Sequence, residues 1–169
     1  MSVRARVDDA LFLWEHKRME GAFLSARAAV AASARLRYPN RTAIGDRVAF
    51  ERFLKSALSV TIGVEFRGEA HPVEHILYKW LRCELVHEGG VPVDIKFVSK
   101  EDPSQLSIRA GGKPDYVLQL SQGWFYHLIN AVATSPENSV NFMDFAPRLA
   151  KSISSKRRGK PRHSKKRTR

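Results

Sequence analysis

The sequence has little cysteine and no long apolar run, and each absence excludes a class of protein. Cys83 is the single cysteine among 169 residues, so the chain cannot form an intramolecular disulfide, which is typical of a reducing compartment. The most apolar run, Ala28–Ala34, is far shorter than the roughly 20 residues that span a bilayer. The first residues include acids and no apolar core of the length that a secretory signal needs. We therefore expect a cytoplasmic protein with no membrane segment.

Acidic residues are absent from the C-terminal end. From position 156 onward the chain carries nine basic residues: Lys156, Arg157, Arg158, Lys160, Arg162, Lys165, Lys166, Arg167 and Arg169. They supply nine of the formal +12 charges, which leaves +3 for residues 1–155. Because no apolar pattern anchors this segment to a core, residues 154–169 are predicted to be a disordered basic tail that contacts nucleic-acid phosphates. A solubilising terminus, or one that meets anionic lipid, is the alternative.

Helical periodicity dominates the first half of the chain. One long helix is predicted from Asp8 or Asp9, either of which can cap it, to Tyr38. A second helix is predicted from Gly45 to about Gly63. A third starts at Pro72 and ends at two glycines, 89–90.

The apolar pattern then changes to alternation. Residues 93–98, 106–108 and 116–120 are predicted to form a small antiparallel sheet of two or three strands. A fourth helix, capped by Ser121, extends to about Pro136. A fifth and weaker helix covers about 140–153, and Pro147 interrupts it.

These elements predict a mainly α fold. With 43% apolar residues, the chain can bury the core of one domain. We expect a bundle of about five helices over residues 1–153, with a small antiparallel β insertion after the third helix, at about 92–120. The basic tail follows at 154–169.

The most informative motif is Arg82-Cys-Glu-Leu-Val-His87, which lies near the predicted end of the third helix. An arginine keeps its charge at all ordinary pH values, whereas an imidazole ordinarily titrates near neutral pH, so the two suit phosphodiester chemistry. On a regular helix the two residues are about 140° apart, and they converge only if His87 lies on a fraying last turn. The alternative is structural, with His87 at the helix C-terminus and Arg82 along the apolar surface.

This motif resembles the Arg-x4–6-His signature of the HEPN (higher eukaryotes and prokaryotes nucleotide-binding) superfamily. The likeness covers six residues, with supporting flanks from about Val73 to Gly90. The superfamily consists of small helical bundles, many of which are metal-independent ribonucleases in toxin–antitoxin, phage-defence and RNA-processing systems. The position after the arginine is often Asn, Asp or His in that superfamily, and here it is Cys83.

The resemblance implies Arg82 and His87 as catalytic residues. Arg82 would bind the phosphate and stabilise charge on its oxygens, and His87 would take the 2′-hydroxyl proton or protonate the leaving 5′-oxygen. Supporting positions are Cys83, Glu84 and Glu88, of which the two acids are either orienting groups or ordinary solvated side chains. Neither a metal nor a cofactor is required. Two copies of the signature would face each other in a homodimer, and an antitoxin or regulatory protein is a possible partner.

Other candidate sites are weaker. His71 and His75 have the spacing of a helix-face metal pair, but no nearby set of ligands completes a zinc site. The run 111–113, Gly-Gly-Lys, lacks the spacing of a phosphate-binding loop and is read as a turn. The three tryptophans lie on apolar helical stripes and are predicted to be core or dimer-interface residues: Trp14, Trp80 and Trp124.

The leading hypothesis is therefore a metal-independent endoribonuclease that acts on RNA, as a toxin or phage-defence factor. Two alternatives stay open: a non-catalytic nucleic-acid-binding module, and a helical interaction protein whose basic tail only aids solubility.

Overall fold

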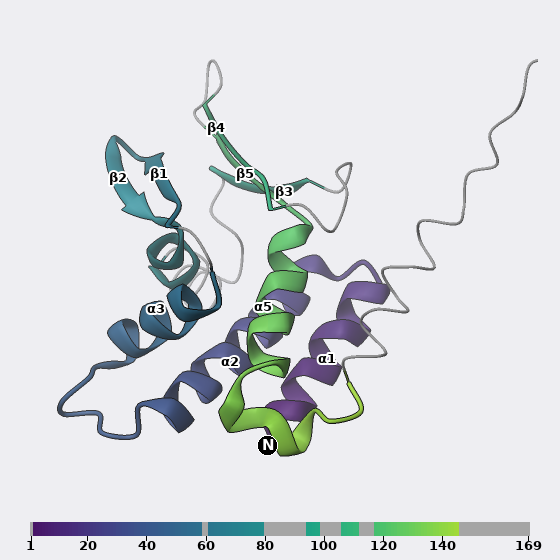
Figure 1. Cartoon of the computed structure of the whole chain (residues 1–169). Helices are drawn as coiled ribbons and strands as arrows, with labels where there is room; N and C mark the ends of the chain where they lie inside the picture. Colours follow the sequence, from purple (N-terminus) through teal and green to yellow (C-terminus); the bar gives the residue numbers. More distant parts are fainter. Residues whose placement is uncertain (1, 59–60, 80–93, 99–105, 112–116, 146–169) are drawn as a thin grey trace, which may run out of the picture.

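The computed structural model describes residues 2–58, 61–79, 94–98, 106–111 and 117–145. Within these ranges the chain is mainly helical, and its strands form a two-stranded and a three-stranded sheet (Figure 1). The predicted mainly α class is confirmed at this level. The β structure is not confined to the predicted insertion at about 92–120, because the two-stranded sheet precedes the helical residues 73–79.

The first predicted helix is divided in two. α1 covers Val3–Glu15 and α2 covers Met19–Arg37. Between them Lys17 has a φ of 59°, in the left-handed region, which ends α1 and turns the chain back. The two helices then pack along each other, and a Cβ on Gly21 would lie only 3.3 Å from Cδ1 of Leu13. The single-helix prediction was wrong because helical periodicity continues across the break, whereas the reversal depends on this packing.

The start of α1 also differs from the prediction. Ser2 is the capping residue, and its Oγ accepts a hydrogen bond from the backbone N–H of Ala5 at 3.2 Å. Asp8 and Asp9, the predicted caps, lie inside the helix and are exposed. Asp8 instead accepts a hydrogen bond from Arg4 Nε at 3.2 Å, one turn earlier.

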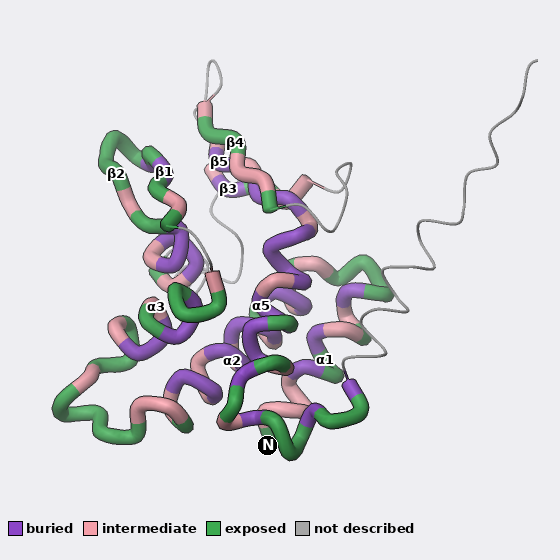
Figure 2. The backbone as a smooth tube through the Cα atoms, in the orientation of Figure 1, coloured by how far each residue is buried: buried purple, intermediate pink, exposed green. Residues whose placement is uncertain are grey.

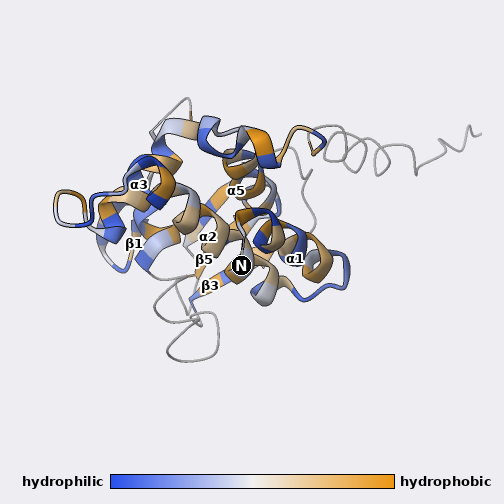
Figure 3. Cartoon of the chain, turned by 90° about the horizontal axis from the view of Figure 1, so that it is seen from below, coloured by the Kyte–Doolittle hydropathy of each residue, from blue (hydrophilic) through white to orange (hydrophobic). Residues whose placement is uncertain are grey.

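α2 is the central helix of the fold. It contacts α1, α3 (Asp46–Ala57) and α5 (Gly123–Ala133). Figure 2 shows buried segments along α2 and α5, and Figure 3 shows apolar residues on the same two helices. Small residues give α2 a surface that neighbouring helices can approach closely, and four of them have no exposed area: Ala22, Ala26, Ala29 and Ser33.

The second predicted helix begins as expected and ends early. α3 follows Gly45, its capping residue, as predicted. It ends at Ala57 and does not extend to Gly63, which is the first residue of a strand. Its buried side chains, Phe50 and Phe53 among them, face the core from a strongly amphipathic helix.

A β-hairpin that the sequence reading missed follows α3. β1 (Gly63–Phe66) pairs antiparallel with β2 (Glu69–Pro72), with Phe66 opposite Glu69. Arg67 and Gly68 between them have φ values of 53° and 79°, as a tight two-residue hairpin turn requires. The strands are only four residues long, too short for their alternation to stand out against the helical pattern on either side.

The predicted third helix begins directly after this hairpin. Residues 73–79 are helical, next to Pro72, which is the last residue of β2. Residues 80–90 of this predicted helix, including Trp80, lie outside the described residues.

The second sheet is mixed, not purely antiparallel. β3 (Ile95–Val98), β4 (Ile108–Gly111) and β5 (Val117–Ser121) are arranged in the order β3-β5-β4. β4 and β5 are antiparallel, as predicted, but β3 and β5 are parallel. Alternation locates strands but carries no information about their direction, so this part of the prediction was wrong. Leu118 and Leu120 on the central strand have no exposed area.

An ion pair joins the hairpin to Asp94, the residue directly before β3. Arg67 Nε donates to Oδ2 of Asp94 at 2.7 Å, and Nη2 donates to Oδ1 at 3.0 Å. This two-point contact with the guanidinium lowers the pKa of the Asp94 carboxyl.

Two of the three tryptophans are core residues, as predicted. Trp14 stacks on Phe125 with ring centroids 4.2 Å apart and planes 3° from parallel, and Trp124 has no exposed area. The indole N–H of Trp124 donates to the backbone oxygen of Ser107 at 3.1 Å. Ser121, the predicted cap of α5, belongs to β5, and its Oγ accepts from the backbone N–H of Ser107 at 3.0 Å. A tertiary hydrogen bond thus takes the place of the predicted local one.

The C-terminal part of the described chain is a short 3₁₀ helix, η1 (Pro136–Asn141), and a turn. The predicted helix from Val140 is therefore wrong at its beginning, since Val140 belongs to η1 and residues 143–145 form a turn. Phe142 and Phe145 bury their rings next to the Arg4 guanidinium, at 5.4 and 5.1 Å. Residues 146–153, including Pro147, lie outside the described residues.

Candidate functional site

The predicted catalytic residues, Arg82 and His87, lie outside the described residues. The same holds for the predicted supporting residues, Cys83, Glu84 and Glu88, and for the basic tail from Lys156 onward. The structure therefore does not test these predictions. It does describe the helical residues 73–79, which end three positions before Arg82 in the sequence.

These helical residues are anchored in the core. Val73 and Ile76 have no exposed area, and Leu77 is 1% exposed. On the same segment, the backbone oxygen of Tyr78 accepts a hydrogen bond from the buried Arg27 of α2 at 3.4 Å. The segment that leads to residue 80 is therefore held by both apolar packing and a hydrogen bond to the central helix.

A cluster of titratable side chains, which we call the histidine cluster, lies where the hairpin, α3 and residues 73–79 meet. It consists of Glu51, His71 and His75. His75 Nδ1 lies 2.8 Å from Oε1 of Glu51, and the two side chains are 15% and 26% exposed. The His71 ring stacks on the His75 ring, with centroids 5.2 Å apart and planes 18° from parallel. A carboxylate bonded to one ring nitrogen fixes the tautomer and orientation of an imidazole, an arrangement suited to proton transfer.

Charged side chains surround this cluster. Arg47 Nε lies 4.0 Å from Glu51, one turn earlier on α3, and the exposed Glu69 lies 3.4 Å from His71 Nε2. Among the described residues, no group of three or more His, Cys, Asp or Glu side chains is placed to hold a metal ion.

A small hollow, here called the Glu74 hollow, opens beside the cluster with a volume of about 230 Å³. Its lining comes from α3, from the end of the hairpin and from the first turn of 73–79: Val48, Glu51, Arg52, Lys55, Thr61, Pro72 and Glu74. Glu74 is 2% exposed, and its buried Oε1 has no hydrogen-bond partner among the described residues. A buried carboxylate oxygen without a partner costs free energy, so it is an unusual feature for a purely structural residue.

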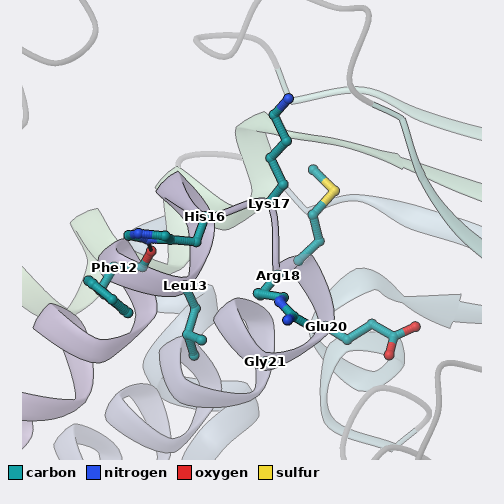
Figure 4. A pocket seen from close by; sticks show the side chains of 8 residues that line it. Phe12, Leu13, His16, Lys17, Arg18, Glu20 and Gly21 are labelled. Carbon is teal, nitrogen blue, oxygen red and sulfur yellow. Dashed lines mark hydrogen bonds between the residues drawn. The ribbon is translucent and has the colours of Figure 1, made fainter.

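A larger hollow, the elbow hollow, lies where α1 turns into α2 (Figure 4). It has a volume of about 850 Å³ and is lined by Phe12, Leu13, His16, Lys17, Arg18, Met19, Glu20 and Gly21. Phe12 is 60% exposed, and the His16 ring lies against it at a centroid distance of 4.2 Å. In Figure 4 these two rings lie at one end of the hollow, Glu20 lies at the other, and Lys17 points away from both. The elbow hollow therefore combines an exposed aromatic ring with cationic side chains.

Sequence reasoning identified two of the three residues of the histidine cluster. The His71-x3-His75 spacing was visible, but Glu51 is 24 residues before His75, and nothing in the local pattern pairs them. Glu74 lies between the two histidines in the sequence. Its burial could not be read from the sequence, because glutamate is among the residues least often buried.

The fold and the site define a mainly helical protein with two small sheets and a polar cluster where the hairpin, α3 and residues 73–79 meet. Residues 2–145 match the model of the protein family described as Rv1289, and the chain belongs to that family. No curated protein matches the chain. No solved structure matches it either. In the part of the chain that the structure describes, no helix is long and apolar enough to cross a membrane.

Proposed function

We propose that this protein is a metal-independent endoribonuclease of HEPN type, which acts as a toxin or phage-defence factor in the cytoplasm. The observation that carries the proposal is the Arg82-x4-His87 string, which in the sequence follows, after two further residues, a helical segment whose Val73, Ile76 and Leu77 are buried. Reacting groups that follow a rigid element can be held in position with little loss of entropy at the moment of reaction. The mainly helical core is compatible with the bundle of that superfamily.

The proposed reaction is intramolecular attack by the RNA 2′-hydroxyl on the adjacent phosphorus. His87 removes the hydroxyl proton, or its counterpart in a second copy protonates the leaving 5′-oxygen. Arg82 binds the phosphoryl oxygens and stabilises the charge that grows on them. The P–O5′ bond breaks as the P–O2′ bond forms, so the products are a 2′,3′-cyclic phosphate and a 5′-hydroxyl.

The experiment that tests this proposal is RNA cleavage in excess chelator. Wild-type protein should release 2′,3′-cyclic phosphate ends, and both Arg82→Ala and His87→Ala should lower the cleavage rate by at least about a hundredfold. Circular dichroism of both variants should match the wild type. Arg41→Ala is a matched control on an exposed described residue, and it should cleave at the wild-type rate. Cleavage that persists in both signature variants refutes the proposal.

The proposal includes a homodimer, in which two signatures share one RNA, and an antitoxin or regulatory partner. Sedimentation equilibrium should give twice the mass of the chain. Mixing inactive Arg82→Ala with inactive His87→Ala protein should restore part of the activity if each subunit supplies one group. No restoration would show that both groups act within one subunit.

A second candidate, a nucleic-acid-binding module without turnover, is favoured by the elbow hollow. Phe12, Lys17 and Arg18 line the same hollow, so the exposed Phe12 ring can stack on a base while the cations contact phosphates. The same assay separates the two candidates, because a module of this kind binds RNA in a mobility-shift experiment and leaves it intact.

A further inference from the structure

Two apolar side chains near the last described residues face solvent. Val140 of η1 is 77% exposed and Met143 of the following turn is 79% exposed, the two highest values among the large apolar side chains described. In consecutive 3₁₀-type turns, side chains three positions apart lie on the same side. Phe142 and Phe145 accordingly both point into the core, while Val140 and Met143 both point outward. These two outward side chains form one small apolar surface, here called the η1 patch.

Arg4 of α1 holds the η1 patch in place. Its Nη1 donates to the backbone oxygen of Asn141 and to Oδ1 of Asp144, both at 2.9 Å. Figure 1 shows this last described stretch, in yellow-green, beside the beginning of α1. Asp144 is the acid next to the patch, and its ion pair with Arg4 offsets its charge. A surface that is fixed in this way needs no ordering before it binds a partner, which favours binding.

The sequence that follows the η1 patch is strongly basic. Residues 156–169 carry nine lysines and arginines and no acids. Lys156 comes thirteen positions after Met143, so even a fully extended chain places it at most about 45 Å from the patch. A partner that meets both features therefore carries negative charge over an extended surface and also admits apolar side chains.

An anionic lipid bilayer has both of these properties. Its headgroups attract lysine and arginine, and its boundary with the acyl chains accepts apolar side chains. The basic segment by itself can contact any polyanion, so the η1 patch is the feature that separates the candidates. Single-stranded RNA binds by stacking its bases on aromatic rings, whereas both side chains of the patch are aliphatic.

A second copy of the chain fits the η1 patch poorly. Two side chains cover far less than the roughly 800 Å² per partner that a stable interface buries. Two copies would also bring two basic segments close together, and like charges repel. The same positive charge attracts an anionic membrane.

We propose that the η1 patch and residues 156–169 together bind the surface of an anionic membrane, with Val140 and Met143 inserted at the headgroup level. Binding of this kind is peripheral and needs no membrane-spanning helix. The apolar anchor and the basic segment reinforce each other, because each keeps the other within reach of the surface. Membrane binding is independent of the proposed RNA cleavage, since it uses neither Arg82 nor His87.

Cosedimentation of the full chain with lipid vesicles tests the proposal. Wild-type protein should bind vesicles made of equal parts of phosphatidylglycerol and phosphatidylcholine, and added salt should weaken this binding. Vesicles of phosphatidylcholine alone should bind at least about tenfold more weakly, because they carry no net charge to attract the basic segment. Equal binding to the two kinds of vesicle overturns the proposal, and so does the absence of binding to the anionic ones.

A double variant assigns the binding to the η1 patch. Val140→Ser combined with Met143→Ser should weaken binding to the anionic vesicles by at least about tenfold, because the inserted apolar area is lost. Its melting temperature should stay at the wild-type value, since both side chains are exposed. Leu24→Ser, which changes an exposed apolar side chain of α2, is the matched control and should bind as the wild type does. Unchanged vesicle binding in the double variant overturns the proposal.

Insertion at the headgroup level is measured with Met143→Trp. Relative to the wild type, its added fluorescence should shift to the blue on anionic vesicles and be quenched by brominated acyl chains. Leu24→Trp should show neither response. Added fluorescence of Met143→Trp that stays unshifted and unquenched on bound vesicles overturns the insertion.

Two further measurements separate this proposal from those about RNA. The double serine variant should bind RNA as the wild type does in a mobility-shift experiment. Loss of RNA binding with vesicle binding retained would identify the η1 patch as a nucleic-acid contact and overturn the membrane proposal. Vesicle binding by protein that cleaves no RNA supports the membrane contact and removes the ribonuclease, whereas cleavage without vesicle binding does the reverse.

Discussion

The side-chain amide of Asn138 donates to Oγ of Ser33 at 2.7 Å, and so joins η1 to the central helix across 105 residues of sequence. Neither residue has exposed surface. The same amide nitrogen lies 3.0 Å from the backbone oxygen of Val132 and 2.9 Å from Oγ of Ser135, at the end of α5. One buried amide therefore connects α2, α5 and η1.

Asn138→Ala should lower the free energy of unfolding by roughly 1–3 kcal/mol, because it leaves the buried Oγ of Ser33 without the amide that donates to it. Urea denaturation followed by circular dichroism measures this difference. Asn141→Ala, in the same 3₁₀ helix but exposed, is the control and should change stability by less than about 0.5 kcal/mol. Equal effects of the two substitutions would contradict this role.

Trp14→Phe should destabilise the fold by roughly 1–3 kcal/mol. The substitution removes the bond from the indole N–H to the Tyr126 hydroxyl, 3.0 Å long and buried, and reduces the stacked area on Phe125. Thermal and urea unfolding measure the loss. Phe12→Leu, on the exposed side of the same helix, serves as the control. A comparable loss of stability in Phe12→Leu would contradict the stabilising role of the Trp14 contacts.

The free energy of unfolding should decrease as the pH falls below about 6.5, and we expect His127 to contribute to this decrease. Burial lowers the pKa of His127, and its Nε2 is buried without a hydrogen-bond partner among the described residues. The unfolded chain therefore binds a proton at a higher pH than the folded chain, so acid favours unfolding. This stabilisation is complete above the ordinary histidine pKa and decreases as the pH falls toward the lower folded-state value.

The measurement is the difference in unfolding free energy between pH 7.5 and pH 5.5. His127→Gln should make this difference smaller than in the wild type. Asn141→Ala, which removes no titratable group, should leave it unchanged. An identical pH dependence in wild type and His127→Gln would exclude His127 as the cause.

Removal of residues 156–169 should weaken RNA binding and flatten its dependence on salt. The segment carries nine basic residues and no acids, and each phosphate contact on a single strand contributes about 0.7 to the logarithmic salt slope. Binding isotherms between about 50 and 300 mM salt measure the slope, because the screening of charge interactions increases over this range. A slope that does not change on truncation would assign the electrostatic contacts to the folded part of the chain.

Local patterns were sufficient for much of the helical fold. The start of α3 at Gly45, the helix after Pro72 and the burial of Trp14 and Trp124 all follow from apolar spacing and helix-end residues within short windows. Strand positions near 95–98 and 117–121 also followed from alternation. The prediction for Arg82 and His87 came from a short string, and it stays a prediction because both residues lie outside the described part.

What the sequence by itself determined is where apolar stripes begin and end, because periodicity and caps act between near neighbours. Only the tertiary structure decided that the chain reverses at Lys17, that β3 runs parallel to β5, and that Glu51 meets His75. It also decided that Glu74 is buried. Each of these depends on which distant surfaces pack together, and packing energy is shared among many residues that no single window contains.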